Sequence, residues 1–269
     1  MKAKRNSPDT IGGAAVAALA LLAGFISLPL VSLIVWTFYE NAWAAMLSPV
    51  ARDALLLSLK TTAISMTIII LVGTPAAYAL ARFDFPGKRL VDALIDIPAV
   101  LPPSAAGIAL LLAFGKLGLL GEYLYVLGIK LPFTMAAVVL AEIFVAAHFY
   151  VRQATVRFDQ ADREVEEAAQ VDGADRTTTF LRVTLPLAFP ALLAGAVTAW
   201  ARALGEFGGT IIFAGNFQGV TQTIPLAIFA ALETDFHAAV AMSVLVLGFA
   251  FTVILTARYL TRRVTEYEN

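Results

Sequence analysis

Long apolar stretches alternate with short polar segments along the whole chain. A helix needs roughly 20 consecutive apolar residues to cross the hydrocarbon layer of a membrane, and each stretch is of about that length or longer. The pattern therefore predicts an all-α polytopic membrane protein. The six expected spans are Ala14–Phe38, Ala54–Leu80, Ala93–Phe114, Phe133–Val151, Leu187–Phe213 and Ala238–Leu260.

Composition agrees with a lipid environment. Of 269 residues, 59% are hydrophobic and 14% are charged, which is far from the balance of a soluble globular domain. The absence of cysteine excludes thiolate chemistry and disulfides, and a net charge of -1 gives no reason to expect a nucleic-acid partner.

We expect residues 1–269 to form one membrane domain. Its first apolar stretch is too long for a cleaved signal segment and predicts an uncleaved anchor.

The distribution of basic residues predicts the orientation. Of 19 lysines and arginines, only Arg52, Lys116 and Lys130 fall in the polar segments on the side opposite the termini. Because basic residues stay preferentially in the cytoplasm, both termini are expected there, together with the segment of about 152–186. The basic residues on the expected cytoplasmic side are Lys2, Lys4, Arg5, Arg82, Lys88, Arg89, Arg152, Arg157, Arg163, Arg176, Arg182, Arg258, Arg262 and Arg263.

Prolines interrupt the third apolar stretch. Pro98, Pro102 and Pro103 remove backbone donors and disfavour helix in the residue before each of them. One interpretation is a bent helix that enters the membrane from an amphipathic stretch. The other is that freed amides beginning at Ser104 line a path for an anion, as helix N-termini can.

The fifth stretch carries Arg202 and Glu206, which are four residues apart and so expected on one helical face. Ionisable residues in a span are costly and normally face the bundle interior or a water-filled path. Thr198 and Gly209 extend the polar stripe. Two interpretations stay open: a buried ion pair that holds helices in register, and an electropositive element that an anion passes.

An acidic segment separates the fourth and fifth stretches. Between positions 159 and 175, seven acidic residues stand against one base, Arg163. Asp159 and Asp162 favour the start of a helix, whose N-terminal dipole attracts negative charge. A solvated surface is one interpretation, and a helix shaped for a groove with basic rims is the other. Residues at three- and four-residue spacing share one face of that helix: Val165, Ala168, Ala169 and Asp172.

Two residues mark the ends of these short helices. Gly173 supplies a left-handed stop for the first helix. Asp175 can cap a second helix, which we expect to end before Pro186 because proline disfavours helix in the preceding residue.

The spacing in this segment resembles the EAA signature of ABC importer permeases. Glu167-Ala168-Ala169 is followed after three residues by Gly173, and after nine more by Val183-x-Leu185-Pro186, with valine where isoleucine is usual. In that family the loop forms coupling helices that dock on the ATP-hydrolysing subunit. The residues to which the resemblance gives a coupling role are Glu166, Glu167, Ala168, Ala169, Asp172, Gly173, Leu185 and Pro186.

Other segments resemble the molybdate permease branch of the molybdate, tungstate and sulfate importers. The matching runs are Leu101–Pro103, Ala201–Thr210, Phe213–Asn216 and Gln222–Ile228. The resemblance implies the six-helix transmembrane domain of a type I importer that carries molybdate, with tungstate or sulfate as alternatives. Two residues depart from the family pattern and leave the local shape of the fourth span open: Glu142, where glutamine is common, and His148, where proline is found in many relatives.

The same resemblance implies partners. They are a second permease copy, most simply an identical one, two cytoplasmic ATP-binding subunits that use ATP and Mg, and an extracytoplasmic oxyanion-binding protein. No cofactor or metal is expected on this chain. The sequence pattern also predicts a short helix over Pro225–Ala231 that lies at the outer membrane surface or dips partway into the membrane. Candidate contacts with the binding protein lie in the polar segment before it: Asn216, Gln218, Thr221 and Gln222.

Two other classes of function compete with this prediction. A secondary anion transporter or channel would share six spans and a central charge, but it would not need an acidic docking helix. A membrane-embedded enzyme would need chemistry that the sequence lacks, since there is no H-E-x-x-H motif, no P-loop, and no histidine besides His148 and His237. The sequence therefore predicts an inner-membrane transport subunit whose ATP hydrolysis takes place on a separate polypeptide.

Overall fold

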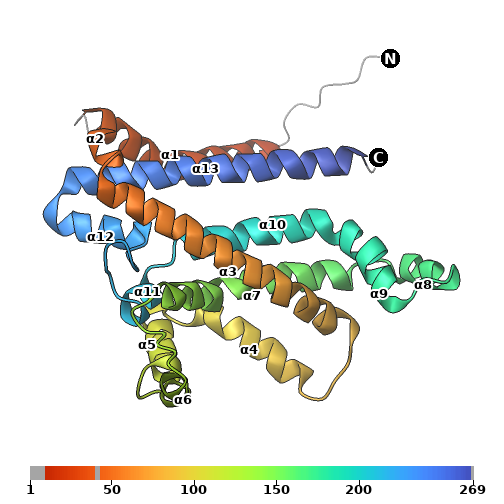
Figure 1. The fold of residues 1–269 in the computed structure, drawn as a ribbon. Helices are drawn as coiled ribbons and strands as arrows, with labels where there is room; N and C mark the ends of the chain where they lie inside the picture. The colour runs from red at the N-terminus through yellow and green to blue at the C-terminus, as the bar shows by residue number, and fades with distance from the viewer. Residues whose placement is uncertain (1–9, 40–42, 268–269) are drawn as a thin grey trace.

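The computed structural model describes residues 10–39 and 43–267, which form helices joined by short loops (Figure 1). In this part of the chain, five helices are long and apolar enough to cross a membrane. Four of them are α1 (Thr10–Tyr39), α3 (Pro49–Arg82), α7 (Met135–Asp159) and α13 (Phe236–Tyr267). The fifth runs from Arg176 to Leu204 and contains α9, η1 and α10. The predicted all-α class is confirmed for the described residues.

The remaining elements are the shorter helices between the long ones and the three parts of the fifth long helix, α9, η1 and α10. They are α2 (Trp43–Met46), α4 (Lys88–Val100), α5 (Pro103–Phe114), α6 (Gly121–Val126), α8 (Arg163–Val171), α9 (Arg176–Thr179), the π-helical turn η1 (Phe180–Thr184), α10 (Leu185–Leu204), α11 (Gly208–Phe213) and α12 (Ile224–Thr234).

The core is built where α3, α7 and α10 lie side by side (Figure 1). Small residues on these helices allow close packing, as is common between membrane helices. A side chain added at Gly73 of α3 would meet Tyr150 of α7, and one added at Gly195 of α10 would meet Gln153. The Tyr150 hydroxyl also lies 2.6 Å from the hydroxyl of Thr74. This three-helix contact sets the frame for both candidate sites.

The third predicted span, Ala93–Phe114, is not one helix. It consists of α4 and α5, separated by two extended residues, Leu101 (ψ 128°) and Pro102 (ψ 138°). Each of these residues precedes a proline, so an α-helical conformation is disfavoured at both, while Pro103 fits the first turn of α5. The expected bend is therefore a complete break. With 12 residues, α5 is shorter than a spanning helix of about 20 residues.

The fifth predicted span, Leu187–Phe213, is also wrong as a single helix. The helix that begins this span, α10, ends at Leu204, and a new helix, α11, begins at Gly208. Glu206 lies in the turn between them, where its Oε1 accepts a hydrogen bond from the Gly209 amide over 2.7 Å. A carboxylate that captures a free amide at the start of α11 stabilises the break.

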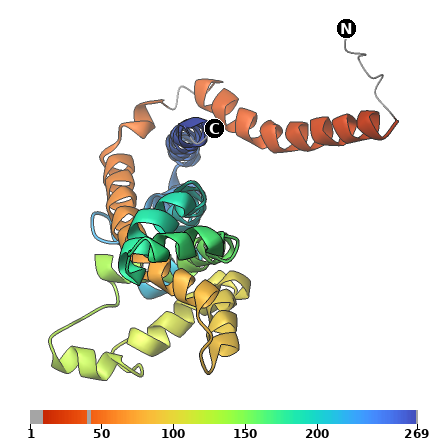
Figure 2. The same ribbon diagram turned by 90° about the vertical axis from the view of Figure 1, so that its right-hand side faces the viewer.

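The short helices α8 and α9 lie at one end of the bundle, and the segment that leads to α12 lies toward the other end (Figure 1). In Figure 1 the C-terminal end of α13 lies at the same end as α8 and α9, whereas α2 and α12 lie at the opposite end. The fourth span continues to Asp159, beyond the predicted limit at Val151. Figure 2 shows α1 extending away from the body of the bundle. Lys2, Lys4 and Arg5, which contributed to the predicted orientation, lie outside the described residues.

Candidate functional site

The two predicted cytoplasmic helices are present as α8 and α9. Asp162 caps α8 by accepting a hydrogen bond from the Glu164 amide over 2.9 Å, whereas Asp159 is the last residue of α7. At the other end, Gly173 has φ +96° and its amide donates to the Gln170 carbonyl. The Ala174 amide donates to the carbonyl of Ala169. These two bonds form a Schellman motif, which requires the left-handed residue that the sequence supplies.

The second helix does not end before Pro186, contrary to prediction. Asp175 caps α9 as expected, and hydrogen bonding from Thr178 holds the pKa of its carboxyl below the ordinary value. The chain then passes through η1, where the Leu185 amide bonds to the Phe180 carbonyl, and continues as α10. In a regular α-helix the Pro186 ring would clash with the carbonyl four residues earlier, and the π turn immediately before it relieves this conflict.

Glu166 and Glu167 point into different surroundings. Glu166 Oε1 accepts a 2.8 Å bond from Arg82 Nη2 at the end of α3 and another of 2.8 Å from the Thr184 hydroxyl. The side chains of Arg82 and Glu166 are only 7% and 13% exposed, so this ion pair is largely shielded from water. Glu167 is exposed. Glu166 thus fixes α8 to the bundle, whereas the Glu167 side chain is exposed.

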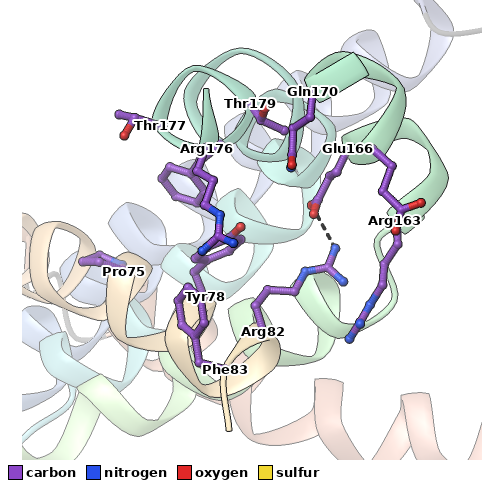
Figure 3. A pocket seen from close by; sticks show the side chains of 12 residues that line it. Pro75, Tyr78, Arg82, Phe83, Arg163, Glu166, Gln170, Arg176, Thr177 and Thr179 are labelled. Carbon is purple, nitrogen blue, oxygen red and sulfur yellow. Dashed lines mark hydrogen bonds and ion pairs between the residues drawn. The ribbon is translucent and has the colours of Figure 1, made fainter. Parts of the chain in front are cut away.

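The other residues to which the sequence gave a coupling role lie at the end of the bundle where α8, α9 and the start of α10 meet (Figure 1). We call this region the coupling corner. Ala168, Asp172 and Gly173 are exposed, and Ala169 is half-buried. Pro186 is exposed at the start of α10, and Leu185 beside it is half-buried. Beside these residues, α3, α8, α9 and η1 line an open cavity of about 680 Å³ (Figure 3).

Arg202 and Glu206 meet, as the sequence predicts, although a helix end lies between them. Arg202 Nη1 is 2.7 Å from Glu206 Oε2, and the Glu206 side chain is 1% exposed. Since Glu206 also accepts the Gly209 amide, both carboxylate oxygens are occupied. The positive charge of Arg202 is therefore balanced inside the chain.

Within the described residues, no hydrogen bond or ion pair joins Thr198 or Ser104 to this pair. Thr198 is exposed, and its hydroxyl donates to the carbonyl of Ala194 in its own helix. Ser104 is exposed in the first turn of α5. This helix approaches α11 closely, because a side chain added at Gly107 would lie 2.8 Å from the Ile212 Cβ. The predicted polar stripe is thus reduced to Arg202, Glu206 and the Gly209 amide.

The four candidate contacts with a binding protein differ in exposure. Thr221 is fully buried, and its hydroxyl accepts a hydrogen bond from the Phe217 amide over 3.0 Å. Gln222 is 9% exposed, and Asn216 is half-buried with a bond to the Leu226 carbonyl. Gln218 is exposed. Thr221 therefore stabilises this loop from within, and Gln218 is the one of the four whose side chain is exposed.

Glu142 forms a buried polar cluster whose partners the sequence did not indicate. Its two carboxylate oxygens accept bonds from Thr61 over 2.7 Å and from Ser65 over 2.6 Å, both on α3. These hydroxyls lie 81 and 77 residues away in sequence, so only the α3–α7 packing brings them together. Three polar residues at three- and four-residue spacing, Ser58, Thr61 and Ser65, were the available signal.

A second cluster joins α4 to α7. Arg152 donates to Asp92 over 2.6 Å and to Asp96 over 2.7 Å, and His148 Nδ1 lies 3.0 Å from Asp96. The polar face of α4 is thus turned to α7, while apolar residues such as Leu94 stay exposed. His148, to which the sequence gave no role, contributes to this attachment.

The family of the chain follows from comparison with known proteins. A family described as "Binding-protein-dependent transport system inner membrane component" matches residues 69–266. The chain belongs to this family. The permease is 44% identical over 239 residues to the molybdenum transport system permease protein ModB of Mycobacterium tuberculosis, covering 88% of this chain and 90% of that protein. It is 36% identical over 214 residues to the probable sulfate transport system permease protein cysT of Nephroselmis olivacea, covering 79% and 75%.

A solved structure has the same fold. The permease matches a chain of a bacterial ABC transporter involved in the import of the polysaccharide alginate with a TM-score of 0.72 at 17% identity, covering 93% of this chain and 95% of that chain. The predicted ABC importer fold is therefore confirmed. The family confirms that this integral inner-membrane chain is a transport subunit, which excludes the interpretation as an enzyme.

Proposed function

We propose that this permease is the membrane subunit of an ATP-driven molybdate importer. Two identical copies form the conduit, two cytoplasmic ATP-binding subunits dock at α8 and α9 and use ATP and Mg, and an extracytoplasmic protein delivers the oxyanion. The permease then has six spans with both termini in the cytoplasm, α4 and α5 together taking the place of the third. The observation that carries the substrate assignment is the 44% identity to a molybdenum transport permease over most of both chains.

The geometry supports a docking role for the α8–α9 corner. Exposed Glu167 and Asp172 present negative charge at the end of the bundle, where a partner with basic residues could bind it. Arg82 and Glu166 hold the other face of α8 on α3. A force applied to the corner is therefore transmitted to the bundle and does not merely bend a loose loop.

The path from the corner to the bundle interior is continuous. α9, η1 and α10 form one helix of 29 residues from Arg176 to Leu204. Arg202 lies in its last turn and is bonded to Glu206 at the break before α11. We assign this pair and Gly209 to the transport pathway, and we keep Thr198 and Ser104 as further candidate pathway residues that are not bonded to the pair. Since Glu206 balances the charge of Arg202, selection among oxyanions is left largely to the binding protein.

Reconstitution of the full complex tests this function. The permease, its ATPase and its binding protein are placed in proteoliposomes, and ATP hydrolysis is measured with binding protein loaded with molybdate, tungstate or sulfate. Molybdate is expected to stimulate hydrolysis and uptake most, with tungstate second. The absence of stimulation by all three anions would refute the proposal.

Sulfate is the second candidate substrate. It is favoured by the 36% identity to a probable sulfate permease, and preferential stimulation by sulfate in the same experiment would select it. A secondary transporter would move the anion without the ATPase, so the complex without ATP is the control that separates it.

A further inference from the structure

The cavity beside the coupling corner contains an arginine whose hydrogen-bonding capacity is only partly used. Arg82 is 93% buried at its side chain, with 7% exposed. Its Nη2 donates to Glu166 and, over 3.1 Å, to the carbonyl of Ala161. Its Nε and Nη1 are buried and have no hydrogen-bond partner within the described chain. Together these two nitrogens carry three N–H groups, and buried donors without partners are rare in native proteins.

Two more arginines line the same cavity from other elements. Arg163 comes from α8 and Arg176 from α9. In Figure 3 they lie on the two sides of Arg82. The carboxylates that line the cavity are Glu166, already paired with Arg82, and Glu167. Three guanidinium groups thus stand against two carboxylates, which leaves the cavity positively charged.

The shape and chemistry of the cavity define a class of ligand. Its volume of about 680 Å³ falls within the usual range of small-molecule sites, roughly 300–1,000 Å³. A guanidinium presents its donors as a planar fork that matches two oxygens of a phosphate-like group. The free Nε and Nη1 of Arg82 point to different edges of its guanidinium, and Nη2, which is common to both forks, is already bonded, so Arg82 can give an anion single hydrogen bonds. The exposed Arg163 and Arg176 can offer complete forks to other oxygens of the same group.

We propose that this cavity is a cytoplasmic binding site for a tetrahedral oxyanion, held by Arg82, Arg163 and Arg176. The ligand is either a free oxyanion such as phosphate or the phosphate headgroup of an anionic lipid, since both offer the same oxygens. The bound anion joins α3, α8 and α9, and so stiffens the segment that carries the docking residues. This site goes beyond the proposed transport role and does not depend on which oxyanion is imported.

The test uses the purified full-length permease in detergent and an R163Q/R176Q double variant. Both arginines are exposed, so their replacement leaves the Arg82–Glu166 pair in place. The matched control is Arg182→Gln, which removes an exposed arginine of the same segment that does not line the cavity. In one arm, binding of radiolabelled inorganic phosphate is measured by equilibrium dialysis. In the other, the protein is taken from nanodiscs with or without phosphatidic acid, and retained lipid is measured by native mass spectrometry.

Saturable binding of phosphate or retention of phosphatidic acid by the wild type supports the site if the double variant weakens it. A loss of about tenfold or more is expected for the removal of charge-assisted hydrogen bonds, with Arg182→Gln close to wild type. Phosphate binding alone identifies a free anion, and lipid retention alone identifies a headgroup. The absence of both, or equal loss in the double variant and the control, would overturn the proposal.

Discussion

Arg82 and Glu166 form a shielded ion pair of 2.8 Å across 84 residues of sequence, and this contact ties the coupling corner to the bundle. Glu166 belongs to the segment that the sequence marked as a docking loop. In the structure, Glu166 is bonded to α3, whereas the neighbouring Glu167 is exposed. Each residue can be tested separately.

Replacing Glu166 by alanine should destabilise the attachment of α8. The change leaves the Arg82 charge buried without its partner and removes the acceptor of the Thr184 hydroxyl, at a cost of about 3 kcal/mol. Thermal unfolding of the purified permease measures this loss. Glu164→Ala, at an exposed position of the same helix, should leave the unfolding temperature close to wild type. Equal shifts for both variants would argue against a holding role.

Replacing Glu167 by lysine should uncouple transport from ATP hydrolysis without unfolding the chain. Glu167 is exposed, so the reversal of charge changes the outer surface of α8 as well as the rim of the cavity that Glu167 lines. We expect normal membrane insertion, weaker co-purification of the ATPase and loss of uptake in proteoliposomes. Glu164→Lys makes the same change of charge on α8. If that variant loses uptake equally, a general surface-charge effect explains the result and docking by Glu167 does not.

Glycine is needed at position 173 because of its left-handed backbone conformation, and not because a side chain would lack room. Its φ is +96°, and a Cβ added there would meet nothing within 4 Å. Gly173→Leu should strain the turn by about 1–2 kcal/mol, whereas Gly173→Asn should be tolerated because asparagine visits the left-handed region more readily. Uptake driven by ATP should fall in the leucine variant and largely persist in the asparagine variant. Equal defects would mean that glycine itself is needed at the partner contact.

Glu142 should tolerate replacement by glutamine. Glutamine can accept one hydroxyl hydrogen bond and donate to the other hydroxyl oxygen, and Ser65 can turn its own hydrogen to the Val139 carbonyl, 3.3 Å away. Glu142→Leu offers neither interaction and should cost about 1–3 kcal/mol. Unfolding temperatures of the two variants give the comparison. A glutamine variant as unstable as the leucine variant would show that the carboxyl group itself is needed.

Arg202→Ala should lower the amount of folded permease. Glu206 is almost completely buried, and an unpaired charge there costs about 3 kcal/mol. The double variant R202A/E206Q removes both charges but keeps an acceptor for the Gly209 amide, so it should restore monodisperse protein in size-exclusion chromatography. Normal folding of Arg202→Ala with loss of uptake would instead favour a direct role in anion passage.

The sequence alone determined the long apolar helices α1, α3, α7 and α13, the positions of the short helices α8 and α9, and the meeting of Arg202 with Glu206. These features depend on hydrophobic length, local caps and four-residue spacing, all of which are read within a few turns of chain. Gly173 is the clearest case, because its left-handed stop needs only the neighbouring residues.

Only the tertiary structure decided the partners of residues that are distant along the chain and the points where helices break. The consecutive prolines Pro102 and Pro103 allow a bend as well as a complete break, and the sequence by itself did not decide between the two. The contact of Arg82 with Glu166 and the cluster of Glu142 with Thr61 and Ser65 likewise join separate helices. No spacing rule predicts such contacts, because they arise only when buried polar groups must find partners away from water.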